Sequence, residues 1–150
     1  MNKEMIIAYG TETGNSELLA MDTAKIAEGL GYETNIGNLD DYTHQDLCKA
    51  TRLIVICSTW GDGEQPDNAE ESYDATCELD TGDLTGVRFA VLALGDTAFD
   101  LFCEAGKQWD EVLESKGALR INERLDCDTD YDDYAEEWIE ETLDKFVNAD

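Results

Sequence analysis

The chain has 150 residues, with 10 Lys plus Arg against 36 Asp plus Glu, and its formal net charge at pH 7 is -26. Its length suits a single domain spanning residues 1–150, and a hydrophobic fraction of 42% argues against disorder. So negative a chain would be repelled by nucleic acids and by anionic membranes. The apolar runs Leu53–Cys57 and Phe89–Leu94 are far shorter than the roughly 20 residues that span a bilayer.

The start of the chain and its cysteines also restrict the class of protein. Residues Met1 to Glu4 lack the basic-then-apolar pattern of a signal peptide, so we expect a soluble, cytoplasmic protein. The cysteines include no C-x-x-C pair, which argues against a disulfide framework and against a zinc site. His44 is the single histidine and lies among polar residues, so we expect an ordinary surface residue and no metal site. The cysteines are Cys48, Cys57, Cys77, Cys103 and Cys127.

Short apolar runs alternate with amphipathic stretches along the chain. We expect five strands and five helices in alternation, beginning with a strand and ending with a helix. The first helix should end at Gly31 and the fourth at Gly117, the second should have at most two turns, and the third is more polar than the others. The expected strands are Glu4–Tyr9, Glu33–Gly37, Arg52–Cys57, Val87–Leu94 and Ala118–Leu125. The expected helices lie around residues 19–30, 43–49, 67–77, 101–113 and 135–146.

The apolar runs of the first, third and fourth strands do not alternate with polar residues, which is typical of strands covered on both faces. Strands that alternate with helices predict a three-layer α/β domain with right-handed crossovers and a parallel sheet. Ligands of such sheets bind beyond the carboxyl ends of the strands. The loops that follow the strands are therefore the places to search for a site.

Three of these loops have an unusual composition. Residues 10–16 hold three hydroxyl side chains, an amide and two glycines directly before a helix, so their N–H and O–H groups could converge on one anion. The plain alternative is a polar turn that caps the helix. The loop has no Lys and does not fit the Walker A or G-x-G-x-x-G patterns, and it suits a phosphate monoester held by neutral donors.

The second and third loops each add an aromatic residue. Residues 58–68 place Trp60 beside Gly61 and Gly63, whose freedom in φ lets the backbone approach a ligand. Residues 94–103 place Phe99 in a small and polar context, and Phe102 fits packing or ligand contact. Two aromatic side chains on neighbouring loops could enclose a planar ring system.

With these three motifs the sequence resembles a flavodoxin of the short-chain type over essentially its whole length. Flavodoxins are the type case of sheet order 2-1-3-4-5 with FMN at the point where the strand order reverses, so the resemblance implies this five-stranded α/β fold and an FMN cofactor. It implies that FMN phosphate is bound by the first loop, that Trp60 and Phe99 flank the flavin, and that the backbone near Gly61, Asp96 and Cys103 meets its polar edge. The implied cofactor-binding residues are Thr11, Glu12, Thr13, Gly14, Asn15, Ser16, Ser58, Thr59, Trp60, Gly61, Asp62, Gly95, Asp96, Phe99, Phe102 and Cys103.

The sequence departs from the family pattern in two places. Phe99 stands where the family usually has tyrosine, and Gln65-Pro66 makes the tryptophan loop less typical. The last strand is expected to run straight from Ala118 to Leu125, without the insertion of long-chain members.

The charge pattern suggests how such a protein would work. Phosphate held without Lys or Arg keeps its charge, and carboxylates surround it in the sequence at Glu12, Asp62, Glu64, Asp67, Asp96 and Asp100. Adding a second electron in this negative field is unfavourable, so we expect a low-potential semiquinone/hydroquinone couple and a one-electron carrier rather than an enzyme. The acidic rim would steer basic-surfaced reductases and acceptor enzymes into transient complexes with a monomer. Alternatively, the excess of acidic residues serves solubility or salt tolerance.

Three other functions fit the same topology. A signalling receiver would need an aspartate where the third strand ends Cys57-Ser58-Thr59. An FMN-dependent quinone reductase would need a nicotinamide and substrate pocket, usually built by insertions or oligomer contacts, and the sequence has no such insertion. An FMN domain resembling those of two-flavin reductases is the nearest alternative.

Overall fold

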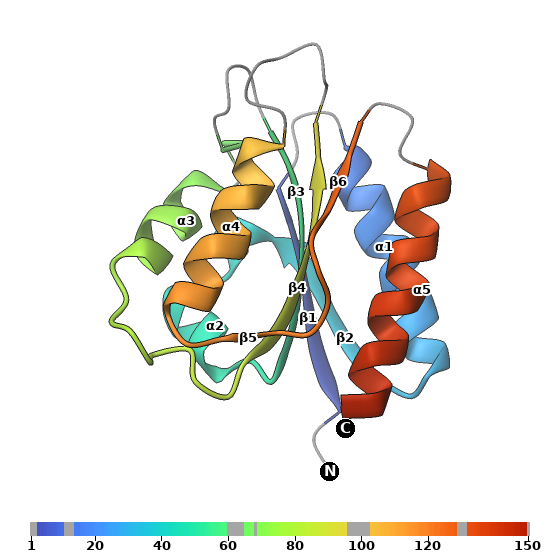
Figure 1. The fold of residues 1–150 in the computed structure, drawn as a ribbon, viewed down its shortest axis with the longest axis horizontal. Coiled ribbons are helices and arrows are strands. Elements are labelled where there is room, and N and C mark those ends of the chain that lie inside the picture. Colours follow the sequence, from blue (N-terminus) through green and yellow to red (C-terminus); the bar gives the residue numbers. More distant parts are fainter. Residues whose placement is uncertain are drawn as a thin grey trace.

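The computed structural model describes residues 3–10, 14–59, 65–67, 69–95, 103–128 and 132–149. These residues form a parallel sheet with helices on both faces, in the order β2-β1-β3-β4-β5, with β6 also beside β4 (Figure 1). The elements are β1 Glu4–Gly10, α1 Asn15–Gly29, β2 Glu33–Asn38, a 3₁₀ turn Leu39–Asp41, α2 His44–Lys49, β3 Arg52–Ser58, α3 Glu70–Cys77, β4 Arg88–Leu94, α4 Glu104–Ser115, β5 Leu119–Arg120, β6 Leu125–Cys127 and α5 Asp132–Ala149.

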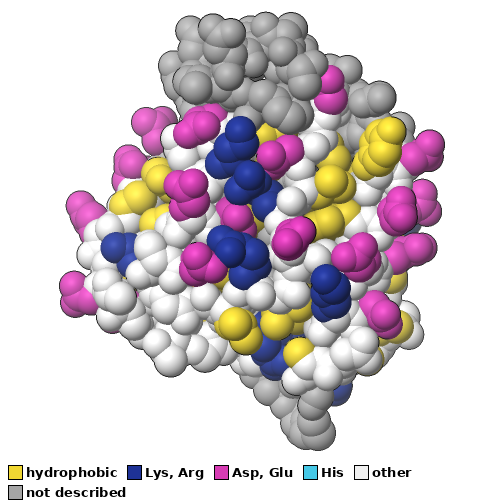
Figure 2. Space-filling model, in the orientation of Figure 1, with side chains coloured by type: hydrophobic (Ala, Val, Ile, Leu, Met, Phe, Trp, Pro, Cys, Tyr) yellow, Lys and Arg dark blue, Asp and Glu magenta, His cyan; other side chains and the backbone are white. Residues whose placement is uncertain are grey.

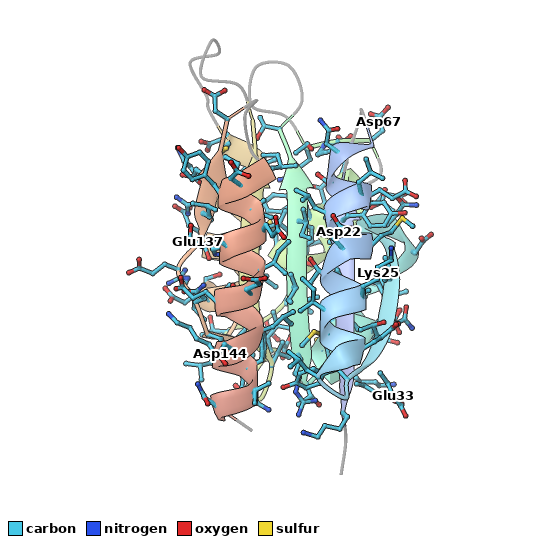
Figure 3. All side chains as sticks on the ribbon, turned by 90° about the vertical axis from the view of Figure 1, so that its right-hand side faces the viewer. Asp22, Lys25, Glu33, Asp67, Glu137 and Asp144 are labelled. Carbon is cyan, nitrogen blue, oxygen red and sulfur yellow. The ribbon has the colours of Figure 1, made fainter. Side chains whose placement is uncertain are left out.

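Two hydrophobic cores explain why the central strands are apolar without alternation. Side chains that alternate along a strand point to opposite faces of the sheet. In β3, Ile54 and Ile56 enter the core under α1 and α5, while Leu53 and Val55 enter the core under α2, α3 and α4. Figure 3 shows α1 and α5 side by side across the first of these faces. The expected three-layer α/β fold and its strand order are thereby confirmed.

The last strand differs from the sequence-based prediction. Instead of one strand over residues 118–125, β5 and β6 are separate, and each pairs with its own part of β4. The interruption coincides with Asn122, whose side chain is turned inward and is 6% exposed. Its Nδ2 donates to Thr142 Oγ1 at 2.9 Å, and its Oδ1 accepts from the Glu123 N–H at 2.9 Å. These bonds bind residue 122 to its own loop and to α5 instead of continuing the ladder.

The helices follow the expected pattern with small shifts at their ends. The helix expected over Asp67–Cys77 begins at Glu70, and Thr43 caps α2 through its side chain, which accepts from the Asp46 N–H at 3.1 Å. His44 is exposed, as expected. Within the ranges given above, no helix is both long and apolar enough to cross a membrane.

Candidate functional site

The predicted site loops leave three adjacent strands at the same edge of the sheet. Gly10 of β1 lies beside Cys57 of β3, and Ser58 lies beside Leu94 of β4. The carboxyl ends of β1, β3 and β4 therefore lie next to one another, toward the top of Figure 1. This is the switch point of the sheet, because β1 is followed by β2 on one side and the chain then returns to β3 on the other.

The first loop leads into the N-terminus of α1. The first N–H groups of an α-helix have no partner within the helix, and Gly14, which precedes α1 with φ 90, has no side chain to accept from them. Among the described residues, a Cβ at Gly14 would meet no heavy atom within 4 Å. Asn15 and Ser16 form the first turn of α1.

Ser16 joins the first loop to the second. Its Oγ lies 2.8 Å from Ser58 Oγ, and Ser16 is fully buried while Ser58 is partly exposed. In such a pair one hydroxyl donates to the other, and the accepting hydroxyl keeps its own proton for a third group. The pair is thus a neutral donor set at the end of a 15-residue helix, which fits an anion such as a terminal phosphate.

Thr59 and Gly95 connect the second and third loops. The Thr59 N–H donates to the Leu94 carbonyl at 3.0 Å, and the Gly95 N–H donates to the Cys127 carbonyl at 2.9 Å. A Cβ at Gly95 would lie 2.8 Å from the Cys103 backbone nitrogen, so only glycine fits this approach. The two ends of the third loop are therefore packed against each other.

Cys103 immediately precedes α4 and has φ 56, a left-handed conformation that is uncommon for a residue other than glycine. Its Sγ lies 3.5 Å from the Cys127 carbonyl. Burial, helped by the charge of Asp126, raises the pKa of Cys103 to about 12, and burial also raises the pKa of Cys57. Both thiols stay protonated at neutral pH, so neither serves as a thiolate nucleophile.

Seven predicted site residues are thus brought to this edge: Gly14, Asn15, Ser16, Ser58, Thr59, Gly95 and Cys103. The other predicted site residues lie outside the described residues: Thr11, Glu12, Thr13, Trp60, Gly61, Asp62, Asp96, Phe99 and Phe102. In the part of the chain that the structure describes, no three His, Cys, Asp or Glu side chains are placed to hold a metal ion.

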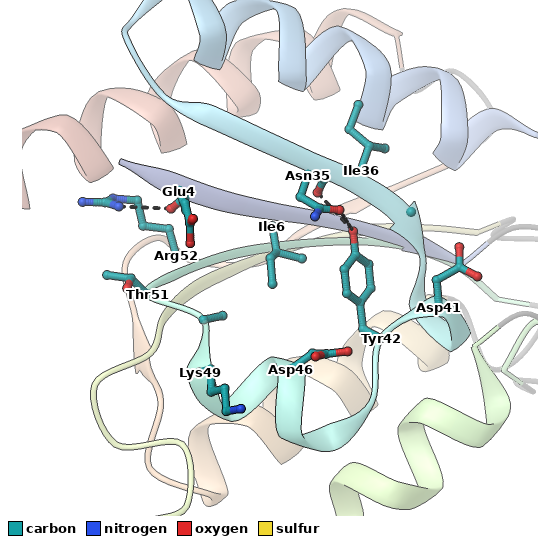
Figure 4. Close-up of a pocket in the computed structure, with 12 residues that line it drawn as sticks. Glu4, Ile6, Asn35, Ile36, Asp41, Tyr42, Asp46, Lys49, Thr51 and Arg52 are labelled. Atoms are coloured by element: carbon teal, nitrogen blue, oxygen red, sulfur yellow. Dashed lines mark hydrogen bonds between the residues drawn. The ribbon is translucent and has the colours of Figure 1, made fainter. Parts of the chain in front are cut away.

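A hollow of about 430 Å³ lies elsewhere, between β2 and α2 (Figure 4). Ile6, Ala50 and Tyr42 contribute apolar surface, and Tyr42 donates its hydroxyl proton to Asn35 Oδ1 at 2.7 Å. None of the seven site residues lines this hollow. α2, which borders the hollow, has six residues.

The family model for flavodoxin matches residues 7–140. The chain belongs to the flavodoxin family. The expected resemblance is thereby confirmed, and with it the FMN cofactor: this chain is an FMN-binding member of the flavodoxin family. The N-terminus of α1 and the neutral Ser16–Ser58 pair agree with a phosphate-bearing cofactor at the switch point.

Solved flavodoxins match the chain over nearly its full length. Flavodoxin from Streptococcus pneumoniae TIGR4 has a TM-score of 0.87 and 28% identity, covering 98% of this chain and 99% of that one. Oxidised flavodoxin 1 from Bacillus cereus has a TM-score of 0.83 and 26% identity, covering 97% of each chain.

Curated relatives have higher identity but are much longer. The sulfite reductase [NADPH] flavoprotein alpha-component of Bacillus subtilis is 40% identical over 143 residues, which are 95% of this chain and 24% of that protein. The corresponding protein of Vibrio cholerae is 36% identical, over 93% of this chain and 23% of that protein. The chain thus spans about a quarter of the length of these relatives.

Gln65 has a structural role beside the site that the sequence alone does not reveal. In the sequence it is only a departure from the family pattern. In the structure its side chain bonds to α4, where Trp109 Nε1 donates to Gln65 Oε1 at 3.0 Å. The signal was an amide side chain at the end of a loop, but its partner lies 44 residues away.

Proposed function

We propose that this chain carries single electrons at low potential between redox proteins, using non-covalently bound FMN. The observation that carries the proposal is the neutral donor set at the switch point, formed by the start of α1 and the Ser16–Ser58 pair. The three site loops, residues 10–16, 58–68 and 94–103, contain no Lys or Arg and six carboxylates. A bound phosphate there would keep its negative charge.

FMN, when bound, takes up and releases electrons one at a time. The α1 N–H groups and the two serine hydroxyls would hold its phosphate, and Thr59 and Gly95 would lie beside the remainder. At an effective dielectric of about 20, one carboxylate roughly 10 Å away opposes an added negative charge by about 1.7 kcal/mol. The loop carboxylates therefore lower the potential at which the second electron enters.

The acidic surface supports a proposal about partners. Figure 2 shows acidic side chains spread over one face, with Lys and Arg gathered in a column over its middle. Two of the arginines of the chain, Arg120 and Arg124, are paired with Asp110. An excess of carboxylates attracts basic-surfaced reductases and acceptors and sustains fast, transient encounters. We propose such partners for a monomeric protein in the cytoplasm.

Ser16 gives a direct test of the phosphate site. Ser16→Ala removes one hydroxyl of the pair and should weaken FMN binding by about tenfold or more, since a hydrogen bond to a charged group contributes about 1.5–3 kcal/mol. Quenching of flavin fluorescence on titration of apoprotein measures the dissociation constant. Ser115→Ala, at the far end of α4, is the control and should leave affinity unchanged. Equal affinities in the Ser16 variant and the wild type would contradict the assignment.

A stepwise reductive titration tests the carrier function. We expect two separate one-electron steps in the visible spectrum of the FMN-loaded protein, with the second step at low potential and becoming less negative as salt screens the carboxylates. A single two-electron step would overturn the proposal.

The curated relatives favour a second candidate, the flavin-binding part of a two-flavin reductase. Their identities of 36% and 40% exceed those of the solved flavodoxins reported above. NADPH distinguishes the candidates when the protein is studied in its natural length. A reductase would bleach its flavin with NADPH alone, whereas a carrier would need a separate reductase.

A further inference from the structure

Both ends of the segment between Thr59 and Gln65 are bonded to one residue of α4. The Ala105 N–H donates to Thr59 Oγ1 at 3.0 Å. Gln65 Nε2 donates to the Ala105 carbonyl at 3.1 Å. Ala105 is fully buried as the second residue of α4, so it provides a fixed point for the two exits of the second site loop.

The Gln65 amide uses both of its polar atoms in this arrangement. Oε1 accepts from Trp109 Nε1 at 3.0 Å and faces the Cys57 thiol at 3.6 Å. Nε2 donates to the Ala105 carbonyl and to Gln108 Oε1, the latter at 3.0 Å. A flipped amide would place its NH₂ against the indole N–H, so only one orientation satisfies all partners.

Trp109 is itself held firmly. It is fully buried and meets Tyr73 edge-on, with ring centroids 5.4 Å apart and an interplanar angle of 74°. A buried indole N–H needs an acceptor, and Gln65 Oε1 is the acceptor that the structure provides. The Gln65 amide is therefore held by a buried side chain of α4.

The same first turn of α4 also closes the third site loop. Cys103 comes two residues before Ala105 and lies against Gly95 and the Cys127 carbonyl. The described residues at the ends of the second and third loops thus meet at the start of α4. By family resemblance these two loops carry the aromatic side chains that flank the flavin.

We propose that Gln65 is a positioning residue for FMN: by joining the end of the second loop to Ala105 and Trp109, it fixes that loop relative to the third. This inference rests on the proposed function. A residue that only stabilised the fold would change the unfolding temperature. A positioning residue also changes the affinity for FMN and the separation between its two one-electron potentials.

The test compares apoprotein variants titrated with FMN and then reduced stepwise. Gln65→Leu keeps the size of the side chain and removes its polar atoms, and we expect FMN to bind at least about tenfold more weakly and the two midpoint potentials to shift by unequal amounts. Gln65→Glu keeps the acceptor for Trp109 but loses the donors to Ala105 and Gln108, so it should also weaken FMN binding and provides a second variant if Gln65→Leu misfolds. Its readout is the affinity, because the added charge by itself lowers the potentials. Gln45→Leu, exposed on α2, is the matched control.

Trp109→Phe completes the test, because it removes the indole N–H and keeps an aromatic ring. If Gln65 acts through Trp109, the double variant should bind FMN no more weakly than the weaker single variant. Affinity within twofold of wild type in both Gln65 variants together with unchanged potentials in Gln65→Leu, or additive losses in the double variant, would overturn this inference alone. A wild-type apoprotein that does not bind FMN would overturn the proposed function as well.

Discussion

Gly106→Ala is expected to destabilise the fold by about 3 kcal/mol, lowering the melting temperature by about 10 °C. Gly106 lies in the first turns of α4, where a Cβ would come 2.2 Å from Ala93 Cβ and 3.0 Å from Ala93 Cα. Ala93 is fully buried in β4, so its backbone cannot yield. Alanine is favoured over glycine by about 1 kcal/mol in a helix, and the clash must exceed this gain. Urea unfolding with apoprotein measures the net effect.

Gly29→Ala is the matched control, since it adds the same methyl group to the last residue of α1. Nothing lies within 4 Å of the new Cβ, so we expect no loss of stability and a gain of up to about 1 kcal/mol. If both variants unfold at the same urea concentration, α4 does not pack on β4 at this distance. The contact matters for function because α4 begins beside the site, and its displacement would also move Ala105 away from Thr59 and Gln65.

The sequence predicts the parts of this protein that depend on local patterns. Unbroken apolar runs such as Leu53–Cys57 identify strands covered on both faces, because alternate residues must enter two cores. The three polar loops identify the site edge, since parallel strands all end on one side. Both inferences need only the order of residues along the chain.

The sequence does not predict features that depend on distant partners. Residues 118–125 contain enough apolar residues for a continuous strand, yet Asn122 bonds to Thr142, 20 residues further on, and the strand is interrupted. The part played by Gln65 depends in the same way on Trp109. Such side-chain bonds depend on how α4 and α5 pack on the sheet. The local hydrophobic periodicity of the sequence does not predict that packing.

Individual carboxylates also have structural roles that the overall excess of acidic residues does not indicate. Asp110 lies on α4 with its side chain 8% exposed, and it binds arginines on both sides of the strand interruption. Its Oδ1 accepts from Arg120 Nε at 2.9 Å, and its Oδ2 accepts from Arg124 at 3.0 Å. Arg124 also binds Asp126 of β6. Although burial alone would lower the pKa of Arg124, its bonds to Asp126 and the charges of Asp126 and Asp110 raise it, so this arginine stays charged.

Asp110→Asn should therefore destabilise the protein by about 2–3 kcal/mol. The amide keeps the shape of the carboxylate, but it removes the negative charge between two partly buried arginines and presents one arginine with an NH₂ group in place of an acceptor. Breaking a buried ion pair by changing one partner typically costs about 3–5 kcal/mol, and we expect less because both arginines retain another carboxylate and some contact with water. Urea unfolding of the apoprotein at neutral pH measures the loss.

Glu114→Gln on the same helix is the control for this effect. Glu114 pairs with the same Arg120 at 2.6 Å, but its side chain is 58% exposed, so water compensates for the lost charge. We expect a change below about 1 kcal/mol. Both substitutions remove one negative charge from a chain of net charge -26, so each reduces the overall repulsion among the carboxylates of the chain by the same amount. A difference between the two variants therefore reports the burial of Asp110, and equal stabilities would show that the two arginines do not depend on it.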